Sequence, residues 1–259
     1  MLRRARSATL DTRTTGKGAF EPMEADMTVV GRVAGLWRYP VKSMAAEALD
    51  GVEVSWHGLA GDRRWAFIRA GQLRSGFPWL TIREQPELAH YRPRFAEPDR
   101  PDASRVLVRT PGGGELDVAD PALAAELGPG VHVIKQDRGV FDTMPLSLLT
   151  TQTVASLGRL AGASLTAGRF RPNLLVEACG GDFPEDAWLG RNLRVGGLRM
   201  RVDQRDQRCV MVTIDPVTLG RNPAVLRAIA RERDARLGVY GSIVAPGPIA
   251  LGDPVELEP

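Results

Sequence analysis

Residues 29–39, VVGRVAGLWRY, open a series of short segments rich in branched and aromatic side chains. Turns that contain Gly, Pro or Asp separate these segments, and this punctuation is typical of β-strands joined by loops. Strands are expected in the first half at 29–39, 52–56, 64–69, 105–109 and 131–136. Strands are expected in the second half at 170–176, 198–202, 209–214, 238–244 and 255–257.

Two segments of the second half have the pattern of amphipathic helices. The first spans 149–160 and begins with threonines that can cap a helix. The second spans 222–237, with Asn222 as the N-cap and Gly238 as the C-terminal cap. Strands outnumber helices, so the sequence predicts a strand-dominated α+β protein.

Residues 1–27 have almost no apolar periodicity, and we expect a disordered tail there. The segment 137–145 lies between the two sets of strands and is interpreted as a soft boundary. The glycine-rich PGGGE at 111–115 is expected to be a hairpin loop, because the Gly-Lys-Ser/Thr of a phosphate-binding loop does not follow it.

The composition is that of a globular protein. Hydrophobic residues make up 43% of the 259 residues and charged residues 25%, which allows a substantial core. No uninterrupted apolar run approaches the ~20 residues that span a bilayer. The net charge is +3, and the basic residues are scattered among acids instead of forming the dense stripe of a nucleic-acid binder. We therefore expect a soluble cytoplasmic protein with no membrane or nucleic-acid partner.

The two cysteines, Cys179 and Cys209, are too few for a disulfide scaffold or for the four thiolates of an iron–sulfur cluster. The three histidines are widely spaced, so a zinc site is not expected. Cys179 precedes a glycine turn and is interpreted as structural. Cys209 follows Arg208, whose charge favours a thiolate that could be a nucleophile or a soft metal ligand. A small buried hydrophobic side chain is the other interpretation of Cys209.

Three further clusters place cations, hydroxyls and amides at the ends of expected strands. They are YPVKS at 39–43, GDRRW at 61–65 and RFRPN at 169–173. Such groups bind anionic ligands, phosphates above all. The Gly-x-Ser-x-Gly of serine hydrolases and the Gly-x-Gly-x-x-Gly of dinucleotide-binding proteins are absent. Together with Cys209, the clusters indicate a site for a phosphorylated heterocycle and a soft metal.

The ordered set of motifs resembles the MOSC family, and its layout is most similar to the amidoxime-reducing component type. The motifs are YPVKS at 39–43, GDRRW at 61–65, FRPN at 170–173, RC at 208–209, TIDP at 213–216 and LGDPV at 251–255. The resemblance implies a MOSC N-terminal β-barrel-like domain over 28–140, as a β-rich companion. It also implies a β-barrel-like MOSC domain over 141–259.

The resemblance implies a molybdenum atom held by molybdopterin, with the thiolate of Cys209 as the protein ligand and catalytic residue. The residues implied to hold the cofactor are Lys42, Ser43, Arg63, Thr143, Arg171, Asn173 and Arg208. Met144 departs from the serine of the family pattern, so one hydroxyl donor is missing at that edge. A pyridoxal phosphate-type anion pocket is not expected.

The implied activity is that of an oxidoreductase. It would reduce N-hydroxylated compounds such as amidoximes, hydroxylamines and N-hydroxylated bases. Electrons would come from a separate partner, a ferredoxin or flavin reductase, because two cysteines cannot hold a cluster in this chain. Two alternatives remain open. One is a non-catalytic carrier of the molybdenum cofactor, and the other is a sulfur-transfer protein that uses Cys209 as a persulfide.

Overall fold

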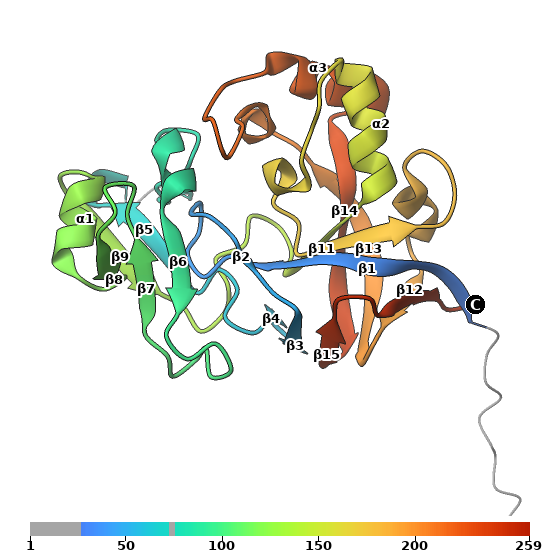
Figure 1. The fold of residues 1–259 in the computed structure, drawn as a ribbon, viewed down its shortest axis with the longest axis horizontal. Coiled ribbons are helices and arrows are strands. Elements are labelled where there is room, and N and C mark those ends of the chain that lie inside the picture. The colour runs from blue at the N-terminus through green and yellow to red at the C-terminus, as the bar shows by residue number, and fades with distance from the viewer. Residues whose placement is uncertain (1–26, 73–75) are drawn as a thin grey trace, which may run out of the picture.

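A closed barrel of seven strands forms the second half of the molecule (Figure 1). The computed structural model describes residues 27–72 and 76–259, so nearly all of the tail expected at 1–27 lies outside the described residues. Around the barrel the strands run β1 (Thr28–Arg38), β11 (Leu174–Ala178), β10 (Leu146–Thr150), β14 (Arg236–Ala245), β13 (Leu198–Gln207), β12 (Asn192–Val195) and β16 (Pro254–Leu257). Because β1 also pairs with β11, the ring closes.

The first half carries smaller sheets and lies to the left of the barrel in Figure 1. One sheet pairs β5 (Trp65–Arg69) with β9 (Val131–Lys135), and another consists of β6 (Arg92–Phe95), β7 (Val106–Arg109) and β8 (Glu115–Asp117). The helix α1 (Pro121–Leu127) precedes β9. The expected hairpin loop at 111–115 is confirmed, because it joins β7 to β8.

Two connections join the halves. β1 comes from the first half of the sequence yet completes the barrel of the second, and β2 (Glu47–Ala48) pairs with its end. Conversely, β15 (Gly247–Ala250) leaves the barrel and pairs with β3 (Gly51–Ser55), which also pairs with β4 (Gly58–Leu59). The domain boundary near residue 140 stays a prediction, and the structure adds that strands cross it in both directions.

Each part has its own apolar core, and alternation along the strands explains why. In β1, Val33 is buried while its neighbours Arg32 and Ala34 are exposed, as expected for side chains that alternate between two faces. One core fills the barrel, a second fills the first half, and a third lies under the two longer helices. Those helices are α2 (Thr151–Ala161) and α3 (Pro223–Arg233).

The two predicted helices are confirmed, with corrections at their ends. Thr150 caps α2 by accepting a hydrogen bond from the backbone of Thr153, so the helix begins at Thr151 and not at 149. α3 begins after the Asn222 cap as predicted. It ends at Arg233 and not at 237, because Asp234 turns the chain with φ 54° and residues from 236 onward join β14.

The strand predicted at 209–214 is wrong. β13 runs past its predicted end to Gln207, and a short 3₁₀ helix follows at Val210–Thr213. The strand predicted at 170–176 begins only at Leu174, because a 3₁₀ helix occupies Ala167–Phe170. Cys209 and Arg171 therefore lie in tight turns beside strand ends. The remaining 3₁₀ helices are Ala70–Gln72, Pro86–His90 and Pro184–Trp188.

No helix within residues 27–72 and 76–259 has the length and apolar character needed to cross a bilayer.

A substitution at Gly31 tests whether β1 closes the barrel. A Cβ at this position would lie 2.6 Å from the backbone oxygen of Glu177 on β11, and backbone cannot move as a side-chain tip can. We expect Gly31→Ala to lower the free energy of unfolding by about 2 kcal/mol, as overpacking does. Gly181→Ala is the matched control, because no atom lies within 4 Å of its built Cβ. Urea denaturation measures both; equal stabilities would contradict this role of β1.

Candidate functional site

Cys209 lies on the wall of a cavity of about 290 Å³, and its side chain is partly exposed. This partial exposure does not fit the alternative interpretation of Cys209 as a small buried hydrophobic side chain. The residues that line the cavity are Arg63, Arg83, Asp142, Thr143, Ser147, Arg169, Phe170, Arg171, Asp206, Gln207, Arg208, Cys209, Met211, Val212 and Tyr240. Arginine is the most frequent residue among them, so the cavity is strongly cationic.

The fold brings these residues together from several strand ends. The end of β13 supplies Arg208 and Cys209, and the turn before β11 supplies Arg169 and Arg171. The turn before β5 supplies Arg63. These segments meet because β13, β14, β10 and β11 are successive neighbours in the barrel. The cavity therefore lies at the junction of the barrel with the first half.

Protein oxygens fix two of the arginines. Arg208 donates to the carbonyl oxygens of Leu237 at 2.8 Å and Phe170 at 2.9 Å. Its Nη1 also forms an ion pair with Asp206 at 2.8 Å. Arg169 binds Asp215 at 2.7 Å, while its buried Nε has no hydrogen-bond partner among the described residues. Both guanidinium groups are held at the cavity wall, and their charge is available to a ligand.

The ring of Tyr39 supports the other two central arginines. The guanidinium carbons of Arg63 and Arg171 lie 4.4 Å and 4.2 Å from its centroid. Arg63 is further held by Asp62 and by the carbonyl oxygen of Arg171, 3.2 Å from its Nη2. In contrast, the buried Nη2 of Arg171 has no hydrogen-bond partner among the described residues. Burial lowers the pKa of Arg171 to about 10, which leaves the group charged at neutral pH. An unsatisfied buried cation of this kind is suited to an anionic ligand.

Backbone conformation also distinguishes this region. Within the described residues, seven non-glycine residues have positive φ, and three of them are Ser43 (68°), Arg63 (50°) and Arg171 (54°). All three are among the eight residues that the sequence assigned to the site. Left-handed backbone is costly for such side chains, and it gathers where function requires an unusual arrangement.

Asp206 and Tyr240 add an acidic and a phenolic group to the cavity wall, and Asp206 lies beside Arg208. Burial raises the pKa of Asp206 to about 6, an effect larger than the opposing attraction of Arg208. Tyr240 donates a hydrogen bond to Asp206, and burial together with that carboxylate raises the pKa of Tyr240. Near neutral pH, this hydrogen-bonded pair can therefore hold or release a proton inside the cavity.

The structure places the remaining predicted residues around the cavity. Lys42 is 6% exposed, and its ammonium group binds Asp142 at 2.5 Å. Lys42 is therefore connected to the cavity through the carboxylate of Asp142, which is a lining residue. Burial lowers the pKa of Lys42 even though Asp142 opposes the shift. Ser43 is buried and does not belong to the lining. Asn173 borders a smaller adjoining space of about 30 Å³, as does Met144.

The side-chain amide of Asn173 is fully used within the protein. Its nitrogen donates to the carbonyl oxygen of Trp37 and to Asp62, while its oxygen accepts from Ser147 and Arg63. Asn173 therefore supports the site from behind and has no donor left for a ligand.

The cavity thus contains Arg63, Thr143, Arg171, Arg208 and Cys209 from the predicted set. Sequence reasoning did not assign Arg83, Arg169, Asp206 or Tyr240 to the site. Arg169 belongs to the RFRPN motif at 169–173, and Asp206 lies two residues before the RC motif at 208–209, so these motifs could have indicated both residues. Arg83 and Tyr240 are isolated in the sequence, and only the fold brings them there.

Two domain families match the chain. The MOSC N-terminal beta barrel domain matches residues 30–138, and the MOSC domain matches residues 135–256. The chain belongs to the MOSC family. The predicted family and the strand-dominated fold class with a barrel are thereby confirmed.

Relatives of this MOSC protein fall into two groups. Mitochondrial amidoxime-reducing component 1 of Homo sapiens is 25% identical, over 88% of this chain and 83% of its own length. Mitochondrial amidoxime reducing component 2 of Bos taurus is 24% identical, over 87% and 83%. Molybdenum cofactor sulfurase of Drosophila yakuba is 28% identical over 78% of this chain, but the match covers 30% of the sulfurase. The relatives connect the family with the molybdenum cofactor.

Solved structures also resemble this MOSC protein. The YuaD protein of Bacillus subtilis aligns with a TM-score of 0.47 at 13% identity, covering 89% of this chain and 97% of its own. YiiM of Escherichia coli aligns with a TM-score of 0.40 at 14% identity, covering 86% and 70%.

The donor set of the cavity fits a molybdenum cofactor. A thiolate from Cys209 is a soft ligand for a transition metal. Guanidinium groups suit a phosphate, and the unpartnered Nη2 of Arg171 provides a donor that the protein itself leaves unused.

Selective alkylation tests the positive potential at Cys209. In cofactor-free protein, we expect anionic iodoacetate to modify Cys209 several-fold faster, relative to neutral iodoacetamide, than it modifies the exposed Cys179. The arginines concentrate the anion, and added salt should reduce the preference. Mass spectrometry of the two cysteine peptides measures the rates. The same reagent preference at both cysteines would contradict a cationic cavity at Cys209.

Proposed function

We propose that this protein is a molybdenum-cofactor-dependent reductase of N-hydroxylated compounds such as amidoximes. One observation carries the proposal: a single partly exposed cysteine lies in a cavity whose wall is dominated by arginine. This arrangement offers one soft ligand for a metal together with a surface for a phosphorylated organic group.

The match to the amidoxime-reducing component supports the proposal of a reductase. The alignment includes 83% of the length of the human amidoxime-reducing component but 30% of the Drosophila sulfurase. The chain thus aligns with most of one reductase component, and we propose the activity that the name of this relative gives.

In the proposed complex, Cys209 ligates molybdenum, and Arg63, Arg171 and Arg208 hold the anionic part of the pterin. Thr143 adds a hydroxyl at the same wall. Asn173 acts indirectly, because its amide fixes Arg63 and Asp62. Lys42 acts through Asp142, whose pKa is set by two opposing effects. Burial raises this pKa, but the charge of Lys42 and its hydrogen bond outweigh burial, so the carboxyl stays ionised.

When bound, the cofactor would supply a two-electron redox centre able to accept the oxygen of the substrate. The net reaction consumes two electrons and two protons and releases the amidine or amine and water. Asp206 and Tyr240 hold an exchangeable proton on the cavity wall. We propose this pair as a source of protons for the reaction. The rigidly held arginines keep the charge of the site positive throughout.

We propose that electrons arrive from a separate protein of the ferredoxin or flavin-reductase kind. The two cysteines of the chain cannot provide the thiolates of an iron–sulfur cluster. A small chemical reductant should therefore replace the partner in an assay.

Replacement of the cysteine tests the proposed ligand. Protein purified with its cofactor should reduce benzamidoxime to benzamidine with reduced viologen as the donor. Cys209→Ser should lower this rate at least about a hundredfold, because the soft ligand that sets the metal's properties is lost. Cys179→Ser is the control and should keep full activity. Product analysis and elemental molybdenum determination provide the two measurements.

The same experiment separates the alternatives. Stoichiometric molybdenum without any reduction of benzamidoxime would point to a cofactor carrier. A persulfide on Cys209 without molybdenum would point to sulfur transfer. Full activity and full molybdenum content in Cys209→Ser would contradict the assignment of Cys209 as the metal ligand.

Arg171 tests how the cofactor is held. We expect Arg171→Gln to lower the molybdenum retained after gel filtration about tenfold, because a charge-assisted hydrogen bond to an anion contributes about 1.5–3 kcal/mol. Arg231→Gln removes the same charge from an exposed position on α3 and should leave retention unchanged. Equal retention in both variants would remove Arg171 from the cofactor site.

A further inference from the structure

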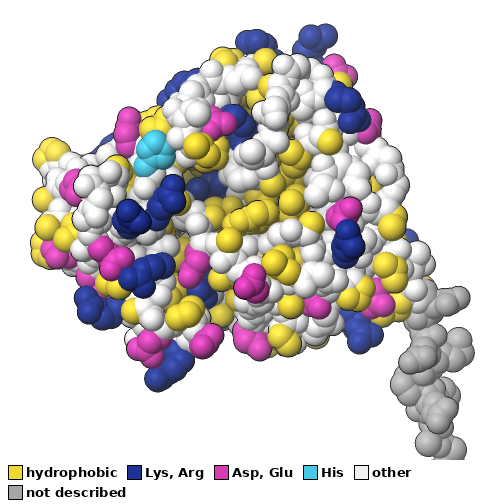
Figure 2. Space-filling model, in the orientation of Figure 1, with side chains coloured by type: hydrophobic (Ala, Val, Ile, Leu, Met, Phe, Trp, Pro, Cys, Tyr) yellow, Lys and Arg dark blue, Asp and Glu magenta, His cyan; other side chains and the backbone are white. Residues whose placement is uncertain are grey.

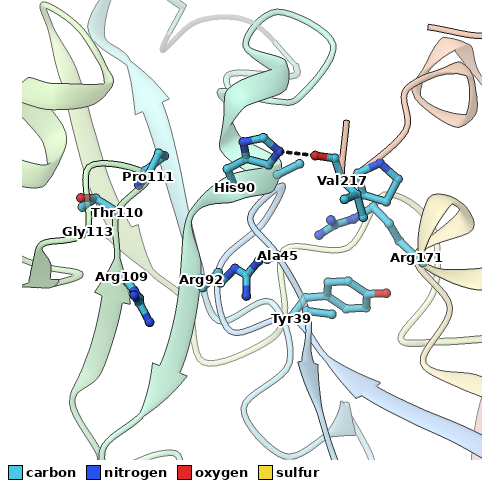
Figure 3. A pocket seen from close by; sticks show the side chains of 14 residues that line it. Tyr39, Ala45, His90, Arg92, Arg109, Thr110, Pro111, Gly113, Arg171 and Val217 are labelled. Atoms are coloured by element: carbon cyan, nitrogen blue, oxygen red, sulfur yellow. Dashed lines mark hydrogen bonds between the residues drawn. The ribbon is translucent and has the colours of Figure 1, made fainter. Parts of the chain in front are cut away.

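A second and larger cavity of about 670 Å³ lies between the first half and the barrel, and Tyr39 and Arg171 are among the residues that line it (Figure 3). Its lining includes Arg92, Arg109, Arg171 and His90, and no described lining residue is Asp or Glu. The space-filling view shows a hollow between the two parts of the molecule, with Lys and Arg side chains beside it (Figure 2). This cavity is therefore cationic as well, and of its cations the proposed function uses Arg171 alone.

Two of its arginines face each other across a strand pair. Arg92 on β6 and Arg109 on β7 are direct partners in the antiparallel register, and both are exposed. Like charges directly opposite one another destabilise a sheet. In the described part of the chain, neither arginine has an ion pair with a carboxylate. The pair thus carries an electrostatic cost that an anion in the cavity would relieve.

The nearest acidic neighbour does not neutralise this pair. Glu115 on β8 is the direct register partner of Arg109. Its carboxylate instead accepts hydrogen bonds from Arg94, at 3.0 Å to one oxygen and 3.1 Å to the other. The carboxylate of Glu115 is therefore engaged by Arg94, and the guanidinium group of Arg109 remains available to a ligand.

The opposite wall supplies a third cation. Figure 3 shows the side chains of Arg92 and Arg171 extending toward each other from the two sides of the cavity. Across the top, His90 Nε2 and the carbonyl oxygen of Val217 lie 2.9 Å apart in a hydrogen bond, which joins the two halves above the cavity.

Most of the remaining lining is apolar, and the cavity has a suitable size for a small molecule. Ala45, Ala89, Pro111 and Pro216 contribute to the wall, and the ring of Tyr39 lies at its base. Pockets for small organic ligands are about 300–1,000 Å³ and combine apolar walls with a few polar groups. A phosphate monoester carries close to two negative charges and three acceptor oxygens at neutral pH, which matches a cavity lined by several guanidinium groups.

We propose that this cavity is a binding site for an organic phosphate monoester, with the phosphate held by Arg92, Arg109 and Arg171 and the organic part on the apolar wall. The side chains of Arg92 and Arg171 are directed into the cavity, which favours a small ligand over an acidic protein surface. The site is separate from Cys209 and shares Arg171 with its cavity. An occupant would therefore contact one of the residues assigned to the molybdenum cofactor.

Calorimetric titration of the protein purified with its cofactor tests the proposal. The probes are 1-naphthyl phosphate, 1-naphthoate, inorganic phosphate and uncharged 1-naphthol. We expect 1-naphthyl phosphate to bind at one site, inorganic phosphate and 1-naphthoate to bind more weakly, and 1-naphthol to show no binding at the same concentrations. Failure of 1-naphthyl phosphate to bind at millimolar concentration, or equal binding of 1-naphthol, would overturn the proposal.

Variants then locate the probe. Arg92→Gln and Arg109→Gln should each weaken binding of 1-naphthyl phosphate about tenfold or more, because each removes a charge-assisted hydrogen bond. Arg231→Gln, which removes an exposed charge from α3, should leave binding unchanged. Glu115→Gln should tighten binding, because it removes a negative charge from the direct register partner of Arg109.

Two further outcomes would contradict the proposal. Unchanged affinity in both Arg92→Gln and Arg109→Gln would place the anion elsewhere, for example in the cavity of Cys209. Binding of polyglutamate through these arginines, without binding of 1-naphthyl phosphate, would assign the surface to an acidic protein. Neither outcome depends on whether the protein reduces amidoximes, so the two proposals fail independently.

Discussion

The arrangement of the site depends on the hydrogen bonds that the buried carboxylate of Asp62 accepts. Asp62 is 1% exposed and accepts hydrogen bonds from the backbone of Tyr39, from the amide of Asn173 and from Arg63. These partners come from the end of β1, the start of β11 and the turn before β5. Because removal of one partner would leave a buried charge uncompensated, all three segments are held together. The ring of Tyr39 is thereby fixed where two guanidinium groups stack on it.

The arginines of the molecule serve two different purposes. Where a carboxylate or carbonyl partner is present, as for Arg208 and Arg169, the side chain is held rigidly and lends its charge to the cavity. Where the described residues form no ion pair with the guanidinium group, as for Arg92, Arg109 and Arg171, the side chain borders a cavity and a ligand can complete its environment. Preorganised and unsatisfied cations lie side by side, which is the condition for anion binding without rearrangement.

Sequence patterns predicted most of the long strands, because alternating burial leaves a clear signature. They failed at 209–214, since an apolar run that packs as a 3₁₀ helix has no distinct period, and at the end of α3, where Asp234 takes the left-handed conformation usually left to glycine. Short elements such as α1, β6 and β12 were missed. The site was predictable where its residues form contiguous motifs, as for Arg208 and Cys209. The sequence does not tell whether a polar group is already satisfied, so the internal role of the Asn173 amide emerged only from the fold.

The path of β1 has a consequence for how such proteins can be divided or recombined. If the chain were cut between its two halves, the barrel would lose the strand that lies between β11 and β16, and both would become open edges with unpaired backbone groups. Open edges of this kind invite pairing with other chains and aggregation. Neither half can be transferred to another protein by itself. A fusion or chimera built from the second half has to include β1.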